Sequence, residues 1–200
     1  MFCVRRASFD DLLEIQNINA VCLPENYRLN FYINHILSWP QLLYVAEDCN
    51  RKIVGYVLGS LDEELSYCHG QIASLAVLRT HRKLGCATKL MKAAEQAMRD
   101  VYGAGSVSLH VRKMNDAAFC LYSKTLGYKV KIFEVAYYRD GADAYEMIKF
   151  FADEKQVSPT VEWQDTTSHL RGKGTPVLTQ EASDDQVSSD PIQQSEHNDL

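Results

Sequence analysis

The sequence of 200 residues lacks any apolar run of the ~18 residues needed to cross a lipid bilayer. Near its start, Asp10 and Asp11 interrupt the chain before an apolar stretch of signal-peptide type can form. No segment repeats at a fixed period, which excludes a repeat architecture. We therefore expect neither a membrane protein nor a secreted one.

Cysteine pairs are also missing. None of the six cysteines forms a C-x-x-C pair, and only Cys68 has a histidine beside it, with no further ligand at zinc-site spacing. We therefore expect no metal site and no disulfide framework, only free thiols of a cytosolic protein. The cysteines are Cys3, Cys22, Cys49, Cys68, Cys86 and Cys120.

Charge is distributed unevenly along the chain, although the formal net charge is −5. Residues 153–200 contain ten acidic and three basic residues and no apolar period, whereas residues 1–152 contain sixteen acidic and eighteen basic ones. With 46% hydrophobic residues, the chain can bury a core. We predict one domain over 1–152 and a disordered acidic tail over 153–200, solubilising or, alternatively, regulatory. Sequence-specific nucleic-acid binding is not expected.

Hydrophobic periodicity predicts the element order β-α-α-β-β-β-α-β-α-β-β, a mixed α/β sheet with helices on its faces. Residues 62–69 read as a polar loop. Strands are expected over 2–7, 42–47, 52–61, 71–78, 106–111, 128–135 and 145–151, and helices over 29–37, 85–102 and 116–126. A further helix is expected to begin at the N-cap Ser8, to carry Leu12, Leu13, Ile15 and Ile18, and to be broken by Pro24.

A strand, a basic loop and a long amphipathic helix follow one another over residues 75–90. The start of a helix has free N–H donors and a partial positive charge. Gly85 and Ala87 leave its backbone accessible, and Arg82 and Lys83 add positive charge, which suits a pyrophosphate. The segment matches neither a Walker loop nor a dinucleotide-binding fingerprint. Tight helix–sheet packing would explain the small residues equally well.

Two motifs that follow one another in the sequence favour the pyrophosphate site over tight packing alone. Arg82-x-x-Gly85-x-Ala87, followed by Asn115-x-x-Ala118-x-x-Leu121-Tyr122-x-x-x-x-Gly127-Tyr128, resembles the two acetyl-CoA motifs of the GNAT N-acetyltransferase superfamily. Residues 23–27, 38–41, 108–113 and 137–145 further resemble the family of NatA N-terminal acetyltransferase catalytic subunits. This resemblance extends over almost all of residues 1–152, and only the loop at 62–69 looks shorter than usual.

The resemblance implies a GNAT fold, a mixed and largely antiparallel sheet of about seven strands flanked by four helices. It implies acetyl-CoA as cosubstrate, with backbone N–H groups of residues 75–77 stabilising the oxyanion and those of residues 82–88 holding the pyrophosphate. The cofactor-binding residues expected in this way are Leu75, Ala76, Val77, Leu78, Arg79, Arg82, Lys83, Leu84, Gly85, Cys86, Ala87, Thr88, Asn115 and Tyr122.

For catalysis the resemblance implies Glu25 as a base or proton relay, Tyr122 as the acid for the departing thiolate, and Tyr138. Without it, Glu25 reads as a surface charge and Tyr122 as a core aromatic, and the Arg112-Lys113 pair could contact ligands or only solvent. The expected substrate-binding residues are Leu23, Pro24, Glu25, Tyr27, His110, Tyr137 and Tyr138.

The resulting hypothesis is acetyl transfer to the α-amino groups of protein N-termini. The resemblance implies small first residues such as Ser, Ala, Thr and Gly, and acidic ones for a free subunit. It implies a large helical-repeat auxiliary subunit, docked on helices 12–18 and 29–37. It also implies that the substrates are nascent chains on cytoplasmic ribosomes, and a nuclear fraction of the protein is left open. The alternatives are an acetyltransferase for lysine side chains or small amines, and a non-catalytic adaptor subunit.

Overall fold

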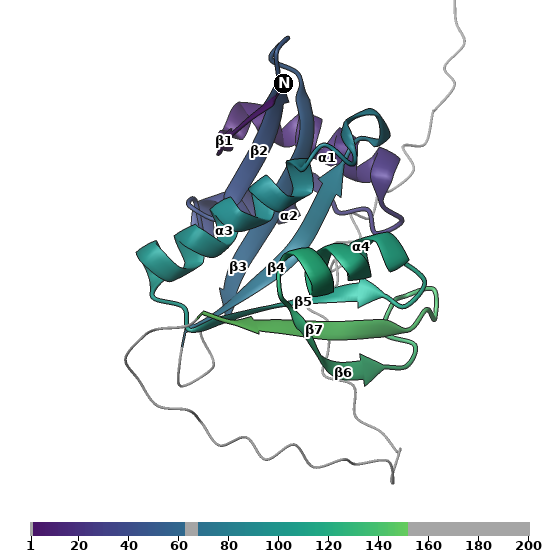
Figure 1. The fold of residues 1–200 in the computed structure, drawn as a ribbon. Coiled ribbons are helices and arrows are strands. Elements are labelled where there is room, and N and C mark those ends of the chain that lie inside the picture. The colour runs from purple at the N-terminus through teal and green to yellow at the C-terminus, as the bar shows by residue number, and fades with distance from the viewer. Residues whose placement is uncertain (1, 63–67, 152–200) are drawn as a thin grey trace, which may run out of the picture. The chain divides into compact units, whose positions relative to one another are not determined.

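The computed structural model describes residues 2–62 and 68–151, which form one seven-stranded sheet flanked by helices (Figure 1). The strand order is β1-β2-β3-β4-β5-β7-β6. The strands are β1 (Phe2–Arg6), β2 (Leu43–Asp48), β3 (Ile53–Asp62), β4 (His69–Val77), β5 (Ser106–Arg112), β6 (Lys129–Glu134) and β7 (Ala144–Phe150). The helices are α1 (Leu12–Cys22), α2 (Leu29–Ser38), α3 (Cys86–Tyr102) and α4 (Asp116–Cys120), with short turns η1 (Phe9–Asp11), η2 (Arg79–His81) and η3 (Leu121–Thr125).

The predicted order of elements and the GNAT-type sheet are confirmed, with three local differences. β4 begins at His69 and β3 reaches Asp62, so the expected polar loop is shorter at both ends, and its residues 63–67 lie outside the described residues. The helix expected over 116–126 ends at Cys120 and continues as a π-helical turn. The first helix starts with a 3-10 turn, η1. The tail over 153–200 also lies outside the described residues.

The π-helical turn has a clear hydrogen-bond pattern. The N–H of Leu126 donates to the carbonyl of Leu121, five residues earlier, at 3.0 Å. The Ser123 hydroxyl donates to the Phe119 carbonyl at 2.7 Å and so competes for the regular helical acceptor. Hydrophobic periodicity does not register such a change because the apolar face of the helix continues through it.

A hydrophobic core lies on each face of the sheet. α3 packs across β1–β4 on one face through residues such as Leu90, Met91 and Met98, which are all fully buried. α1 and α2 cover the other face through Ile15 and Tyr32, also fully buried (Figure 1). In the described part of the chain, no helix is both long enough and apolar enough to span a membrane.

The sheet divides between β4 and β5, its one parallel pair. Four residue pairs join these strands, from His69 opposite Ser106 to Ile72 opposite Leu109. Just beyond, Ala73 is an extra residue in β4, because Leu58 pairs with Ser74 and Gly59 with Ile72. Past this bulge β4 stays on β3 and β5 stays on β7, so the two strands separate (Figure 1). We call this separation of the two strands the β4–β5 gap.

A buried histidine holds the closed end of the gap. The two ring nitrogens of His69 lie 2.8 Å from the hydroxyls of Ser106 and Ser108, which join the first residue of β4 to β5. The His69 side chain is buried, and its burial, reinforced by the positive charge of Lys131, lowers its pKa. The neutral ring is therefore the form that the fold favours.

We predict that the folded chain loses stability as pH falls below the ordinary histidine pKa of about 6.5, because protonating His69 costs more in the folded state than in the unfolded one. Urea midpoints at about pH 7.5 and about pH 5.5 should differ more for the natural chain than for His69→Gln, whose amide does not titrate. His81→Gln, on the loop after η2, is the control and should keep the full difference. An equal pH effect in His69→Gln would contradict this role.

Candidate active site

The start of α3 forms one wall of the β4–β5 gap. Gly85 is the N-terminal cap with φ = +80°, and Lys83 two residues earlier has φ = +61°. Among the described residues no side chain caps this helix, and its first backbone bond runs from Lys89 N–H to the Gly85 carbonyl at 3.1 Å. The preceding N–H groups, those of residues 86–88, are thus available to an anion.

The side chains of this loop have separate roles. Burial raises the pKa of the Cys86 thiol to about 11, so Cys86 offers its backbone N–H and not a thiolate. The neighbouring Leu84 side chain is 61% exposed and Ala87 is partly buried. Positive charge comes from Arg79, Arg82 and Lys83, all exposed. A negatively charged ligand would therefore meet both backbone donors and cations here.

Arg82 also bonds the loop to the last residue of β4. Its Nε donates to the Val77 carbonyl at 2.9 Å. The N–H of the next residue, Leu78, donates to the Val54 carbonyl on β3 at 2.8 Å. Because the N–H groups of a strand alternate in direction, those of Val77 and Leu75 face the gap, whereas that of Ala76 faces β3. Of the three amides expected for the oxyanion, two are therefore placed to contribute.

A charged cluster forms the opposite wall. The Arg112 guanidinium contacts Glu25 Oε1 through Nε at 2.7 Å and through a terminal nitrogen at 2.5 Å. It also contacts Asp140 at 2.8 Å and lies over the Tyr138 ring, 4.2 Å from its centroid. Burial, together with the negative charge of Glu25, raises the pKa of the Tyr138 hydroxyl. The phenol is therefore a proton donor at neutral pH.

Aromatic rings continue from this cluster. His110 and Tyr137 stack with ring centroids 4.2 Å apart and planes 6° apart, and Tyr137 meets Tyr138 edge to face at 5.1 Å. Burial raises the pKa of Tyr137 to about 12. Tyr27 stacks on Phe31 at 4.1 Å, and its pKa is raised by burial and by the charge of Glu25. These rings line a polar surface suited to a short peptide.

Tyr122 lies on η3 and belongs to the hydrophobic core beneath α3. It is 7% exposed, its burial raises its pKa, and its ring meets that of Tyr128 at 5.9 Å. Asn115, expected near the cofactor, caps α4, because its Oδ1 accepts the N–H of Ala118 at 3.2 Å. The contact between Asn115 and the cofactor stays a prediction.

The structure groups most of the predicted residues into two sets and leaves Asn115 and Tyr122 apart from them, on α4 and η3. The expected cofactor set follows β4, η2 and the start of α3, and the expected substrate set joins the α1–α2 connection to β5 and the β6–β7 turn. Sequence reasoning left Arg112 undecided and placed Asp140 in the motif at 137–145 without giving it a role. No sequence signal marks the contacts of Arg112, because Glu25 and Asp140 lie 87 and 28 residues away from it in the sequence.

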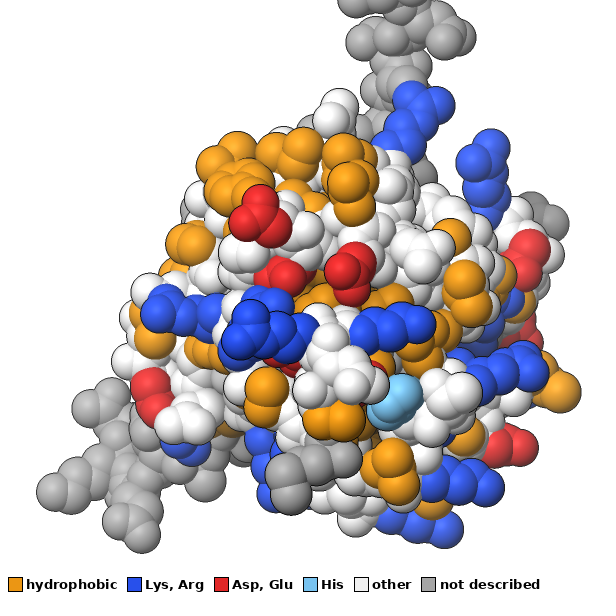
Figure 2. Space-filling model, turned by 90° about the horizontal axis from the view of Figure 1, so that it is seen from above, with side chains coloured by type: hydrophobic (Ala, Val, Ile, Leu, Met, Phe, Trp, Pro, Cys, Tyr) orange, Lys and Arg blue, Asp and Glu red, His pale blue; other side chains and the backbone are white. Residues whose placement is uncertain are grey.

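Figure 2 looks down on the end of the molecule where β4 stops and α3 begins. Lys and Arg side chains form a band across this face, and hydrophobic side chains gather beside the band. This pattern suits a site that takes a negatively charged cofactor next to an apolar surface.

Comparison with known proteins agrees with this geometry. Residues 12–128 match the Acetyltransferase (GNAT) family. The chain is 64% identical over 149 residues to the N-terminal acetyltransferase A complex catalytic subunit NAA10 of Arabidopsis thaliana, covering 74% of this chain and 78% of that protein. It is 48% identical over 158 residues to the N-terminal acetyltransferase A complex catalytic subunit ard1 of Schizosaccharomyces pombe, covering 78% and 89%.

Solved structures share the fold. Chaetomium thermophilum Naa20 in complex with a bisubstrate analogue matches with a TM-score of 0.66 and 32% identity, covering 74% of this chain and 86% of that one. The NatC complex bound to Gag peptide and CoA includes a chain that matches with a TM-score of 0.71 at 24% identity, covering 76% and 99%.

The chain therefore belongs to the GNAT acetyltransferase family, whose members use acetyl-CoA. Within it, the sequence identity groups the chain with the catalytic subunits of N-terminal acetyltransferase A, which are Nα-acetyltransferases.

We predict that Arg82→Ala mainly weakens acetyl-CoA binding. The change removes a cation beside the helix start and the bond to the Val77 carbonyl, so KM for acetyl-CoA should rise about tenfold. Lys92→Ala, farther along α3, is the control and should leave KM unchanged. Steady-state kinetics with acetyl-CoA varied at saturating peptide would measure both, and an unchanged KM in Arg82→Ala would contradict the assignment.

Proposed function

We propose that this protein transfers acetyl from acetyl-CoA to the α-amino group of small N-terminal residues, with the β4–β5 gap as the reaction site. The observation that supports this most directly is the position of the gap. It lies between the uncapped start of α3 and the cluster of Glu25, Tyr138 and Arg112. A cofactor and an amine could thus enter from opposite walls and meet at the amides of β4.

The chemistry of the amine favours an N-terminus. A free α-amine has a pKa of about 7.7–8.0, against about 10.4 for lysine. Neutralising them at pH 7 costs about 1 and about 4.6 kcal/mol, respectively. A weak base such as Glu25, acting directly or through water, therefore suffices for the α-amine. Arg112 holds Glu25 in place by bonding to Oε1.

The acetyl group requires a stabilised oxyanion and a leaving group. As the amine attacks the thioester carbon, the N–H groups of Leu75 and Val77 would donate to the carbonyl oxygen as it gains charge. The carbon–sulfur bond then breaks, and the thiolate leaves. A thiol has a pKa of about 8.5, so CoA departs readily, and protonation by Tyr122 would add a modest factor.

An auxiliary subunit would bind the apolar surface of the first helices. Several large side chains there are exposed where burial would be expected of apolar residues. They are Phe9 at 55%, Leu13 at 66%, Val21 at 69% and Leu37 at 65%. The expected partner is a large helical-repeat subunit that presents nascent chains at the ribosome. Two relatives are named as catalytic subunits of an N-terminal acetyltransferase A complex, which supports the presence of an auxiliary subunit.

The substrate test is a panel of peptides starting with Ser, Ala, Asp and Met, assayed with the full chain, alone and with an auxiliary subunit. Mass spectrometry would locate the acetyl group on the α- or ε-nitrogen. We expect α-acetylation of Ser and Ala peptides by the assembled enzyme. Acetylation confined to lysine side chains would favour the alternative enzyme, and none at all would contradict the proposal.

We predict that Glu25→Gln lowers kcat about tenfold to a hundredfold, because the amide keeps the bond to Arg112 but cannot accept the amine's proton. Tyr138→Phe should also lower turnover. A pH–rate profile of the assembled enzyme would distinguish the two variants. Only Glu25→Gln should need a higher pH to reach the same rate, because the amine must then lose its proton without a base. Unchanged turnover in Glu25→Gln would remove Glu25 from the mechanism.

A further inference from the structure

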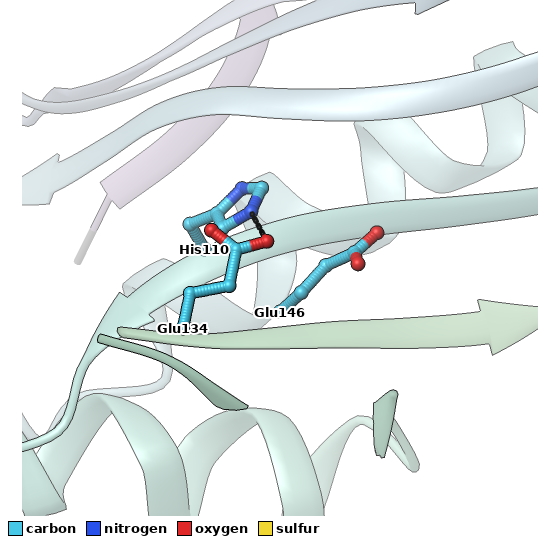
Figure 3. Close-up of side chains that lie close together, drawn as sticks. All are labelled: His110, Glu134 and Glu146. Atoms are coloured by element: carbon cyan, nitrogen blue, oxygen red, sulfur yellow. Dashed lines mark ion pairs between the residues drawn. The ribbon is translucent and has the colours of Figure 1, made fainter. Parts of the chain in front are cut away.

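Three potential metal ligands meet on one face of the second half of the sheet. His110 on β5 lies directly opposite Glu146 on β7, and Glu134 on β6 reaches the same face (Figure 3). One ligand atom from each residue lies within 4.8 Å of the other two. The three residues are far apart in the sequence, so cysteine and histidine spacing did not indicate a site.

The separations suit a small cation. His110 Nε2 lies 3.6 Å from Glu134 Oε1. Ligand atoms bonded to a tetrahedral zinc ion at about 2.1 Å are about 3.4 Å from one another. Small rotations of the two carboxylates would therefore complete a three-ligand site. One imidazole with two carboxylates selects a transition-metal ion such as Zn²⁺ over Mg²⁺ or Ca²⁺, which prefer oxygen ligands alone.

The surroundings hold the ligands in place. The His110 ring is stacked on Tyr137 at 4.2 Å, which fixes its orientation. Lys131 contacts Oε1 of Glu146 at 2.8 Å. Because a carboxylate has two oxygens, the other one can still reach an ion, but Lys131 competes with it electrostatically.

We propose that His110, Glu134 and Glu146 form a binding site for an exchangeable divalent transition-metal ion, and that the bound ion competes with the peptide. The second part rests on the proposed function, because His110 and Tyr137 belong to the expected peptide surface. An ion bound to His110 Nε2 would remove a hydrogen-bonding group from that surface and place a positive charge beside the incoming ammonium.

Binding is tested with Co²⁺ as the probe, titrated into the full chain and followed by its d–d absorption. We expect one equivalent bound without a sulfur-to-metal charge-transfer band, since the ligands are nitrogen and oxygen. This distinction matters because Cys3, Cys49 and Cys120 are exposed thiols. A charge-transfer band from the first equivalent would overturn the assignment.

Matched variants test the ligands individually. Glu134→Gln and Glu146→Gln should each weaken Co²⁺ binding about tenfold or more. Glu47→Gln is the control, because it loses an ion pair of the same kind, with Arg5 on β1, outside the cluster. Lys131→Met should tighten binding by removing the competing cation. Unchanged affinity in both glutamine variants would overturn the site.

Competition is tested with Zn²⁺ in the acetylation assay. It should raise KM for the peptide and leave KM for acetyl-CoA unchanged, and Glu146→Gln should reduce the effect. An unaltered peptide KM at saturating Zn²⁺ would refute competition. If no peptide is acetylated, the proposed function fails, whereas the Co²⁺ titration still decides on the metal site.

Discussion

The separation of β4 from β5 is the constraint on which the rest of this structure depends. Parallel pairing stops after Ile72, where the extra residue Ala73 bulges and β4 continues with β3 alone. Backbone N–H groups that a continuous sheet would use in pairing are left facing an opening. Such groups favour a partner that brings its own acceptor, and a thioester carbonyl is one. The helices pack on both faces of β1–β4 through the two hydrophobic cores.

Charge is divided between the two walls of this opening. The start of α3 and its loop contribute positive charge and free amide donors, and the opposite wall contributes Glu25 and Asp140. Arg112 holds the two carboxylates together and lies over Tyr138, so one cation positions both an expected base and an aromatic wall.

Protonation states follow from burial. The hydroxyls of Tyr122, Tyr137 and Tyr138 all have raised pKa values because they are desolvated, so they remain proton donors across the neutral range. The ring of His69 is kept neutral by the same effect. The tyrosine hydroxyls near the gap are therefore neutral donors, and Glu25 is the carboxylate expected to accept a proton. One expected base among neutral donors suits this reaction, because the amine must lose a proton and then stay neutral until it attacks.

The sequence by itself determined the order of elements and the boundaries of most of them, and it indicated the segment expected to hold a pyrophosphate. Periodicity and helix-start signals are local and act within a few residues of the position that they describe. It also carried the two motifs of the family. The tertiary structure alone decided the π-helical turn, the choice of Leu75 and Val77 over Ala76, and the pairing of Arg112 with Glu25. It alone brought His110, Glu134 and Glu146 onto one face. The π-helical turn goes with a local bond of the Ser123 hydroxyl that hydrophobic periodicity does not register, whereas the other features arise from strand register and from contacts between separate elements, which no local pattern encodes.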